Sequence, residues 1–307
     1  MNKESKVIKM VDTSLLLAVL INLSGCFNSS EKSHHSADIK GVNSLGYNLS
    51  EPDKTMVLPM VLKEVSGITL IDSASVACVQ DENGILFIVD MASNKITSQV
   101  PFYSNGDYEG ITSAENAIYV LRSDGVLFQI LHQGSAGSLK KIFSVGIPPL
   151  DNEGLCYDKK NNRLLIVSKN NPGKNSENKG KHPVYGFDLH SEILLGAPVL
   201  EFDLTTIKKF ASDNHIQASA GEGKIGFNPS AMGIHPVTYK LYVLSASEKA
   251  LFVFNMNGTI EYIAKLDPII FNMPEGIAFY ANGDMLISNE GLINPPTILR
   301  FNYNKIK

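Results

Sequence analysis

One short motif recurs along the chain, and it constrains the fold more than any other feature. In each copy a polar residue is followed by a small one and then by an apolar run typical of a buried strand. The polar positions, which we call the marker residues, are Ser66, Glu109, Glu153, Ser230 and Glu275. They are separated by 43, 44, 77 and 45 residues. A period near forty-four, with one longer interval, is that of the four-stranded blades of a β-propeller.

The other strands of each repeat follow in a constant order. After a turn comes a second apolar run (SVACVQ, AIYVLR, RLLIVSK, KLYVLS, DMLISN), and a third run follows it. The last repeat stops after its third strand, at 301–303, whereas residues 47–59 precede the first repeat without a copy of their own. We therefore predict an all-β, five-bladed β-propeller that residues 47–59 close as the outer strand of the last blade. A six-bladed ring is the alternative, since 170–227 contains further strand-like sequence.

The first 46 residues are predicted to lie outside the propeller domain of 47–307. Three lysines precede the apolar run SLLLAVLINL, which is too short to span a bilayer comfortably and is typical of a signal peptide. It ends in LSGC, which resembles a bacterial lipobox with Cys26 as the lipidated residue, although a plain secretory signal is the alternative. We expect residues 1–25 to be removed, and 26–46 to form a lipid-anchored, flexible tether.

This leader predicts a protein of the bacterial cell envelope, held by lipid on Cys26 and facing the periplasm or the cell surface. Phe27, rather than Asp, follows the cysteine, which favours the outer membrane over the inner one. The formal charge of −4 and the lack of any basic run argue against nucleic acid as a partner. Cys78 and Cys156 lie in apolar runs of different repeats, and we expect buried free thiols and a monomeric protein.

The motifs LKEVSGIT, GDYEGI, NEGLCYD, FNPSAMGIHP and MPEGIAF resemble those of the SdiA-regulated, or YjiK-like, family of bacterial envelope proteins. The resemblance covers roughly 47–303. More distantly, the chain is similar to NHL-type propellers and to calcium lactonases and phytase-like propellers. The resemblance implies a β-propeller, and it implies a fold more firmly than a function.

The marker residues are predicted to line the central channel, where the first strand of every blade lies. Three glutamates around one channel repel one another, which raises their pKa values unless a cation intervenes. The cation could be Ca²⁺ bound by Glu109, Glu153 and Glu275, or the side chains of Arg122 and Lys169, which end second strands. Water in the channel is the third alternative. Ser66 and Ser230 would add hydroxyls, and Glu290 ends a second strand as Lys169 does.

Two classes of function remain open from the sequence. A calcium-assisted hydrolase of lactones, esters or phosphates would need a base, for which Glu290, Asp81 and Asp107 are candidates, but none of them lies in a specific catalytic motif. His235, in the turn after a first strand, is expected to hydrogen-bond to backbone rather than act as a base. We therefore favour a binding module that holds a small anionic or sugar-like ligand, or a protein loop, at the channel mouth, around an optional Ca²⁺ ion.

Overall fold

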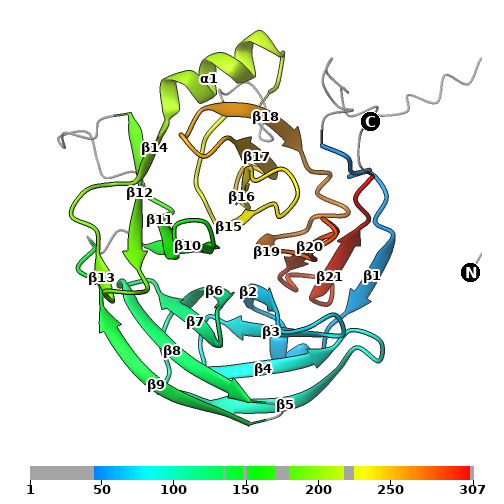
Figure 1. Ribbon diagram of the computed structural model, residues 1–307. Helices are drawn as coiled ribbons and strands as arrows, with labels where there is room; N and C mark the ends of the chain where they lie inside the picture. Colours follow the sequence, from blue (N-terminus) through cyan, green and yellow to red (C-terminus); the bar gives the residue numbers. More distant parts are fainter. Residues whose placement is uncertain (1–44, 134–135, 148–150, 171–179, 218–224, 305–307) are drawn as a thin grey trace, which may run out of the picture. The chain divides into compact units, whose positions relative to one another are not determined.

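A computed structural model describes residues 45–133, 136–147, 151–170, 180–217 and 225–304 (Figure 1). The predicted signal peptide, Cys26 and nearly all of the predicted tether lie outside the described residues. In the part of the chain that is described, no helix combines the length and apolar character needed to cross a membrane.

Five antiparallel sheets are arranged around a central axis, with the first strand of each sheet innermost (Figure 1). This confirms the predicted five-bladed β-propeller. Blades 1 and 2 consist of β2 (Val65–Leu70), β3 (Ser75–Gln80), β4 (Ile85–Asp90) and β5 (Lys95–Pro101), then β6 (Tyr108–Ala114), β7 (Ala117–Arg122), β8 (Val126–Gln133) and β9 (Ala136–Ser144). Blades 4 and 5 consist of β15 (Ala231–Ile234), β16 (Leu241–Ser245), β17 (Ala250–Phe254) and β18 (Ile260–Lys265), then β19 (Pro274–Phe279), β20 (Met285–Asn289), β21 (Thr297–Phe301) and β1 (Lys54–Val57).

Blade 3 accounts for the long interval between marker residues. Its strands are β10 (Asn152–Asp158), β11 (Arg163–Ser168), β12 (Lys181–Asp188), β13 (Ile193–Leu194) and β14 (Leu200–Asp203). Both β13 and β14 pair with β12, so the extra strand material widens this blade and the six-bladed alternative is wrong.

A helix that we did not predict, α1 (Leu204–Asp213), follows β14 and contacts β14 and β18. The Asp203 carboxylate caps it by accepting the backbone N–H groups of Thr205 and Thr206.

The apolar strands pack face to face between neighbouring blades. Each of the five hydrophobic clusters joins two adjacent blades, as Val79 and Phe128 do between blades 1 and 2. Both faces of a blade are therefore covered, which explains why its middle strands are apolar without alternation. Cys78 and Cys156 are buried free thiols within this packing, as predicted.

The small residue after each marker allows the inner strands to approach one another. At Gly110, an added Cβ would lie 2.7 Å from Leu155 Cβ and 2.8 Å from the main-chain oxygen of Glu153, both on the inner strand of the next blade. Contacts of less than 3 Å to these atoms cannot be relieved by turning a side chain. The inner strands touch in the order β2, β6, β10, β15 and β19, and β19 returns to β2.

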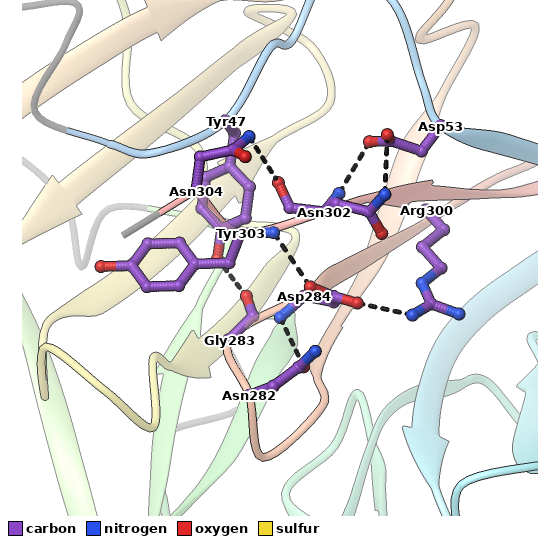
Figure 2. Close-up of polar contacts among 9 residues, drawn as sticks. All are labelled: Tyr47, Asp53, Asn282, Gly283, Asp284, Arg300, Asn302, Tyr303 and Asn304. Carbon is purple, nitrogen blue, oxygen red and sulfur yellow. Dashed lines mark hydrogen bonds and ion pairs between the residues drawn. The ribbon is translucent and has the colours of Figure 1, made fainter. Parts of the chain in front are cut away.

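The predicted closing strand is present in blade 5. β1 pairs with β21 antiparallel, with Lys54 opposite Arg300 and Val57 opposite Thr297. Polar contacts extend this pairing (Figure 2): the Asp53 carboxylate accepts the backbone N–H and side-chain amide of Asn302 at 2.8 and 2.7 Å. The Tyr47 hydroxyl donates to the carbonyl of Gly283. Residues from the two ends of the described chain thus complete one sheet.

Candidate functional site at the channel mouth

The side chains of the marker residues are directed by a local irregularity of the inner strands. In β2, β6, β10 and β19, the pairing with the second strand shifts its register across the marker, from Tyr108 to Gly110 in β6 and from Asn152 to Gly154 in β10. Each marker is therefore the extra residue of a β-bulge, a feature that re-aims a side chain and is common beside functional sites. Ser230 differs, because it immediately precedes β15.

Four of the five marker residues meet in a narrow ring at one end of the central channel. Ser66, Glu109, Glu153 and Glu275 line a space of about 10 Å³, together with the backbone and apolar side chains that follow them. Such a space holds about one water molecule. The other end is wider, about 220 Å³, and its lining includes both apolar side chains and the polar residues Thr69, Thr112 and Ser113. A ligand larger than an ion or a water therefore has to bind at a mouth of the channel rather than pass through it.

The loops around the acidic end are joined by backbone hydrogen bonds into a nearly continuous rim. The N–H groups of Asp81, Ser123, Lys169 and Glu290, which follow or end second strands, donate to the carbonyls of Glu64, Asp107, Asp151 and Met273, which precede first strands. Further bonds link Tyr108 to Asp81, Asn152 to Ser123 and Gly291 to Lys63. The loops that follow the second strands and the loops that precede the first strands thus reach one polar surface, which we call the mouth.

Three carboxylates gather where blades 2 and 3 adjoin the mouth. One oxygen each of Asp107, Glu109 and Asp151 lies within 4.8 Å of the other two. Burial, the charge of Glu153 and the adjacent Asp107 carboxyl, with which Glu109 hydrogen-bonds, raise the pKa of Glu109 to about 10. Two carboxylates can share such a contact only when a proton or another cation lies with them. This group is therefore suited to bind a cation.

The other two channel glutamates have partners of their own. Glu153 is 3% exposed in its side chain and forms an ion pair with Lys169 at 2.6 Å, which is one of the three alternatives that the sequence left open. Burial and Glu275 raise the pKa of Glu153 to about 8, and the contact with Lys169 opposes that rise. Burial raises the pKa of Glu275, although the nearby Lys169 and Ser230 oppose the rise, and the Ser230 hydroxyl donates to the Pro274 carbonyl at 3.1 Å. Three glutamates were predicted as metal ligands. Among the described residues, Glu109 is the only one of them that lies in a group of carboxylates close enough to share an ion.

A second group of acids lies where blades 1 and 5 adjoin the mouth. Burial and the charges of Glu275 and Asp81 raise the pKa of Glu290 to about 7. Burial and the charges of Glu64, Glu82 and Asp107 raise the pKa of Asp81 to about 6. Two of the three candidate bases, Glu290 and Asp81, are therefore near each other and have pKa values close to neutral pH.

One predicted channel cation is placed elsewhere. The Arg122 guanidinium forms a bidentate ion pair with Asp124, at 2.9 and 2.8 Å, and lies over the ring of Phe128. The prediction that it neutralises the channel glutamates is wrong, because a carboxylate two residues away in the same turn is a closer partner.

His235 behaves as expected for a turn histidine. It is fully buried, and its Nδ1 accepts the backbone N–H groups of Val237 and Thr238.

We did not predict two residues of the mouth from the sequence. Asp151 precedes its marker by two residues, as Asp107 does, and this shared spacing was the available signal. Lys249 has no such signal, because it lies in a turn of blade 4 and reaches the Asn272 carbonyl with its Nζ at 2.6 Å.

The raised pKa values predict how stability depends on pH. Glu109, Glu153 and Glu290 have pKa values of about 10, 8 and 7 in the folded protein, whereas a glutamate in an unfolded chain has about 4.3. Folding therefore favours their protonated forms, and this contribution to stability, complete below about pH 4, is lost as the pH rises through 7 to 10.

We expect the free energy of unfolding, measured by urea titration with a chelator present, to fall by several kcal/mol from about pH 6 to about pH 9, because each carboxyl that is protonated only in the folded state contributes about 1.4 kcal/mol per pH unit. Glu109→Gln should reduce the fall, because it removes one of the buried charges. A free energy that rises over this interval would contradict the placement of these carboxyls.

Comparisons with known proteins indicate the fold alone. No family model matches the chain, and no curated protein matches it. Among solved structures, glutaminyl cyclase from Myxococcus xanthus is similar with a TM-score of 0.56 and 12% identity, over 84% of this chain and 97% of that one. A streptogramin B lyase is similar with a TM-score of 0.47 and 12% identity, over 82% of this chain and 97% of the lyase.

Proposed function

We propose that the protein is a binding module that holds a divalent cation at the mouth of its propeller and binds its ligand beside that ion. The observation that carries this proposal is the convergence of Asp107, Glu109 and Asp151 from two blades. Oxygens on opposite sides of a Ca²⁺ ion, each about 2.4 Å from it, are about 4.8 Å apart. The three carboxylate oxygens satisfy that limit in every pair. An all-oxygen, anionic set suits a hard cation, and Ca²⁺ tolerates irregular geometry better than Mg²⁺ does.

The place of the module in the cell is proposed from the sequence alone. The LSGC motif and the polar segment after it support a lipid anchor on Cys26 in the bacterial envelope, and the repeated motifs support membership of the SdiA-regulated family.

The cation site is tested by metal content and calorimetry. We expect about one Ca²⁺ per chain after dialysis against trace calcium, and at least a tenfold loss of affinity in the double variant Asp107→Asn, Glu109→Gln. Glu192→Gln is the matched control, because Glu192 pairs with Lys141 outside the mouth. Equal calcium content in the double variant and the control, or no bound metal in the wild type, would overturn the proposal.

A metal-assisted hydrolase is the second candidate. The observation in its favour is Glu290, whose pKa of about 7 suits a general base. The same purified protein can be tested on lactones, esters, phosphates and, because of the structural similarity to a glutaminyl cyclase, a peptide with N-terminal glutamine. Turnover that Glu290→Gln abolishes at unchanged calcium content would establish an enzyme.

A further inference from the structure

Exposed apolar side chains gather on three loops beside the mouth, the first of which contains the short 3-10 helix η2 (Met60–Leu62). Met60, Val61, Ile269, Leu292 and Ile293, which we call the apolar rim, are between 47% and 99% exposed. They make up half of the ten large apolar side chains that are exposed among the described residues. Single exposed apolar residues need no explanation, but a group of them on adjoining loops indicates an interaction surface.

Hydrogen bonds join these three loops to one another. The N–H of Gly291 donates to the Lys63 carbonyl at 2.7 Å, and the N–H of Leu58 donates to the Pro296 carbonyl at 2.8 Å. The side-chain amide of Asn272 donates to the Glu290 carbonyl at 3.0 Å. The loops that carry Met60, Ile269 and Leu292 are thus held against each other at blade 5.

The loop 290–296 is also shaped by its own packing. A Cβ added to Gly291 would lie 2.8 Å from the Pro296 nitrogen and 2.9 Å from the Asn294 carbonyl oxygen, so the turn is tight. Pro296 and the preceding Asn289 are buried, whereas Leu292 and Ile293 between them are exposed. The loop is therefore anchored at both ends while its apolar side chains face solvent.

The inner edge of the same loops is acidic. Glu64 is the last residue of the loop that carries Met60, and Glu290 is the first residue of the loop that carries Leu292. The backbone N–H of Asp81 donates to the Glu64 carbonyl. The ion pairs between described residues include no lysine or arginine partner for any of these three carboxylates. An apolar surface bordered by unpaired carboxylates complements a ligand that is apolar and cationic.

We propose that the apolar rim and the carboxylates of Glu64, Asp81 and Glu290 bind a segment of a partner protein that presents a lysine or arginine next to an apolar side chain. Glu290 precedes Leu292 by two residues, and Val61 precedes Glu64 by three. An extended chain spans about 3.5 Å per residue, so the two kinds of contact are within about 10 Å of each other. The basic and apolar residues of the partner should therefore be one to three positions apart.

This inference rests on the proposed role of the mouth as a binding site, but it does not require the metal ion. A membrane surface is the competing occupant of an exposed apolar patch, and the acidic edge argues against it because bacterial and cytoplasmic leaflets carry anionic lipids.

Selection from a random heptapeptide library on the purified full chain, with calcium present, tests the inference. We expect enrichment of Lys or Arg within three positions of Leu, Ile, Met or Phe. A synthesised peptide from the selection should bind at least tenfold more weakly, by fluorescence anisotropy, to Leu292→Ser, Ile293→Ser and to Glu290→Gln. Ile193→Ser, which removes an isoleucine that is 58% exposed on β13 in blade 3, is the matched control and should leave the affinity unchanged.

The outcomes separate this inference from the proposed cation site. Peptide binding that persists with a chelator supports the rim even where no calcium is bound. Failure to select basic and apolar peptides, equal affinity in the rim variants, or rim-dependent binding to phosphatidylglycerol vesicles without peptide binding would each overturn the inference, whatever the calcium content shows.

Discussion

We expect a chain that begins at residue 59 to lose its cooperative unfolding transition, because it lacks the strand that closes the ring. Removal of β1 exposes the hydrogen-bonding edge of β21 and takes Met56 and Leu58, which are 1% and 3% exposed, out of the core between blades 5 and 1. An unpaired edge beside an open core favours aggregation. A chain that begins at residue 45 is the matched control, since it keeps β1 and the contacts of Tyr47 and Asp53 (Figure 2).

A milder variant distinguishes loss of the strand that closes the ring from a general failure to fold. Met56→Ala keeps the pairing of β1 with β21 and should lower the free energy of unfolding by about 3 kcal/mol through lost packing. Circular dichroism during urea titration measures both variants. A chain from residue 59 that unfolds in one transition with the same midpoint as the control would show that β1 is dispensable.

The closing strand and the blades were predictable because their signals are local and repeated. Each unit carries the same order of apolar runs, and residues 47–59 are left over at one end while one strand is missing at the other. The Asp-Gly and Asn-Gly pairs that end at Gly125, Gly258 and Gly283 are turn signals in the sequence, and all three glycines have positive φ. Repetition thus compensates for the weakness of any single strand signal.

The arrangement of the mouth was only partly predictable. The marker glutamates were placed in the channel correctly. The bulges that orient their side chains arise from the pairing of two strands, and the sequence of one strand alone does not predict them. Differences of a few ångströms in distance decide which partner each charged side chain takes. Arg122 pairs with Asp124, whereas Lys169 pairs with Glu153. Asp151 joins Glu109 only because blades 2 and 3 approach closely there.

Strand β14 and helix α1 show a different limit. The sequence of β14 was recognised as strand-like. That it pairs with β12, rather than in a sixth blade, could be predicted only by knowing which strand edge of blade 3 was available for pairing. Helix α1 has apolar residues in the spacing of one buried face, with Ile207 and Ala211 buried, yet it is too short for a clear period.

The second large effect is expected at the axis, where Gly110→Val should lower the free energy of unfolding by about 3 kcal/mol. Glycine in a strand is ordinarily less stable than a residue with a side chain, so the usual expectation is a gain. The sign reverses here because a Cβ would meet Leu155 Cβ at 2.7 Å and the main-chain oxygen of Glu153 at 2.8 Å. Relief requires blade 2 to move away from blade 3.

Gly196→Ala is the matched control, because nothing lies within 4 Å of the added Cβ and the residue does not have positive φ. It should raise the free energy of unfolding by about 0.4–1 kcal/mol. Any separation of blades 2 and 3 would also move Glu109 from Asp151, so Gly110→Val should weaken the proposed calcium binding in the fraction that folds, whereas Gly196→Ala should not. Urea unfolding and calorimetry on both variants measure these effects together. A Gly110→Val protein as stable as the control would mean that the blades do not meet at this glycine, and the convergence of carboxylates that depends on their contact would lose its structural basis.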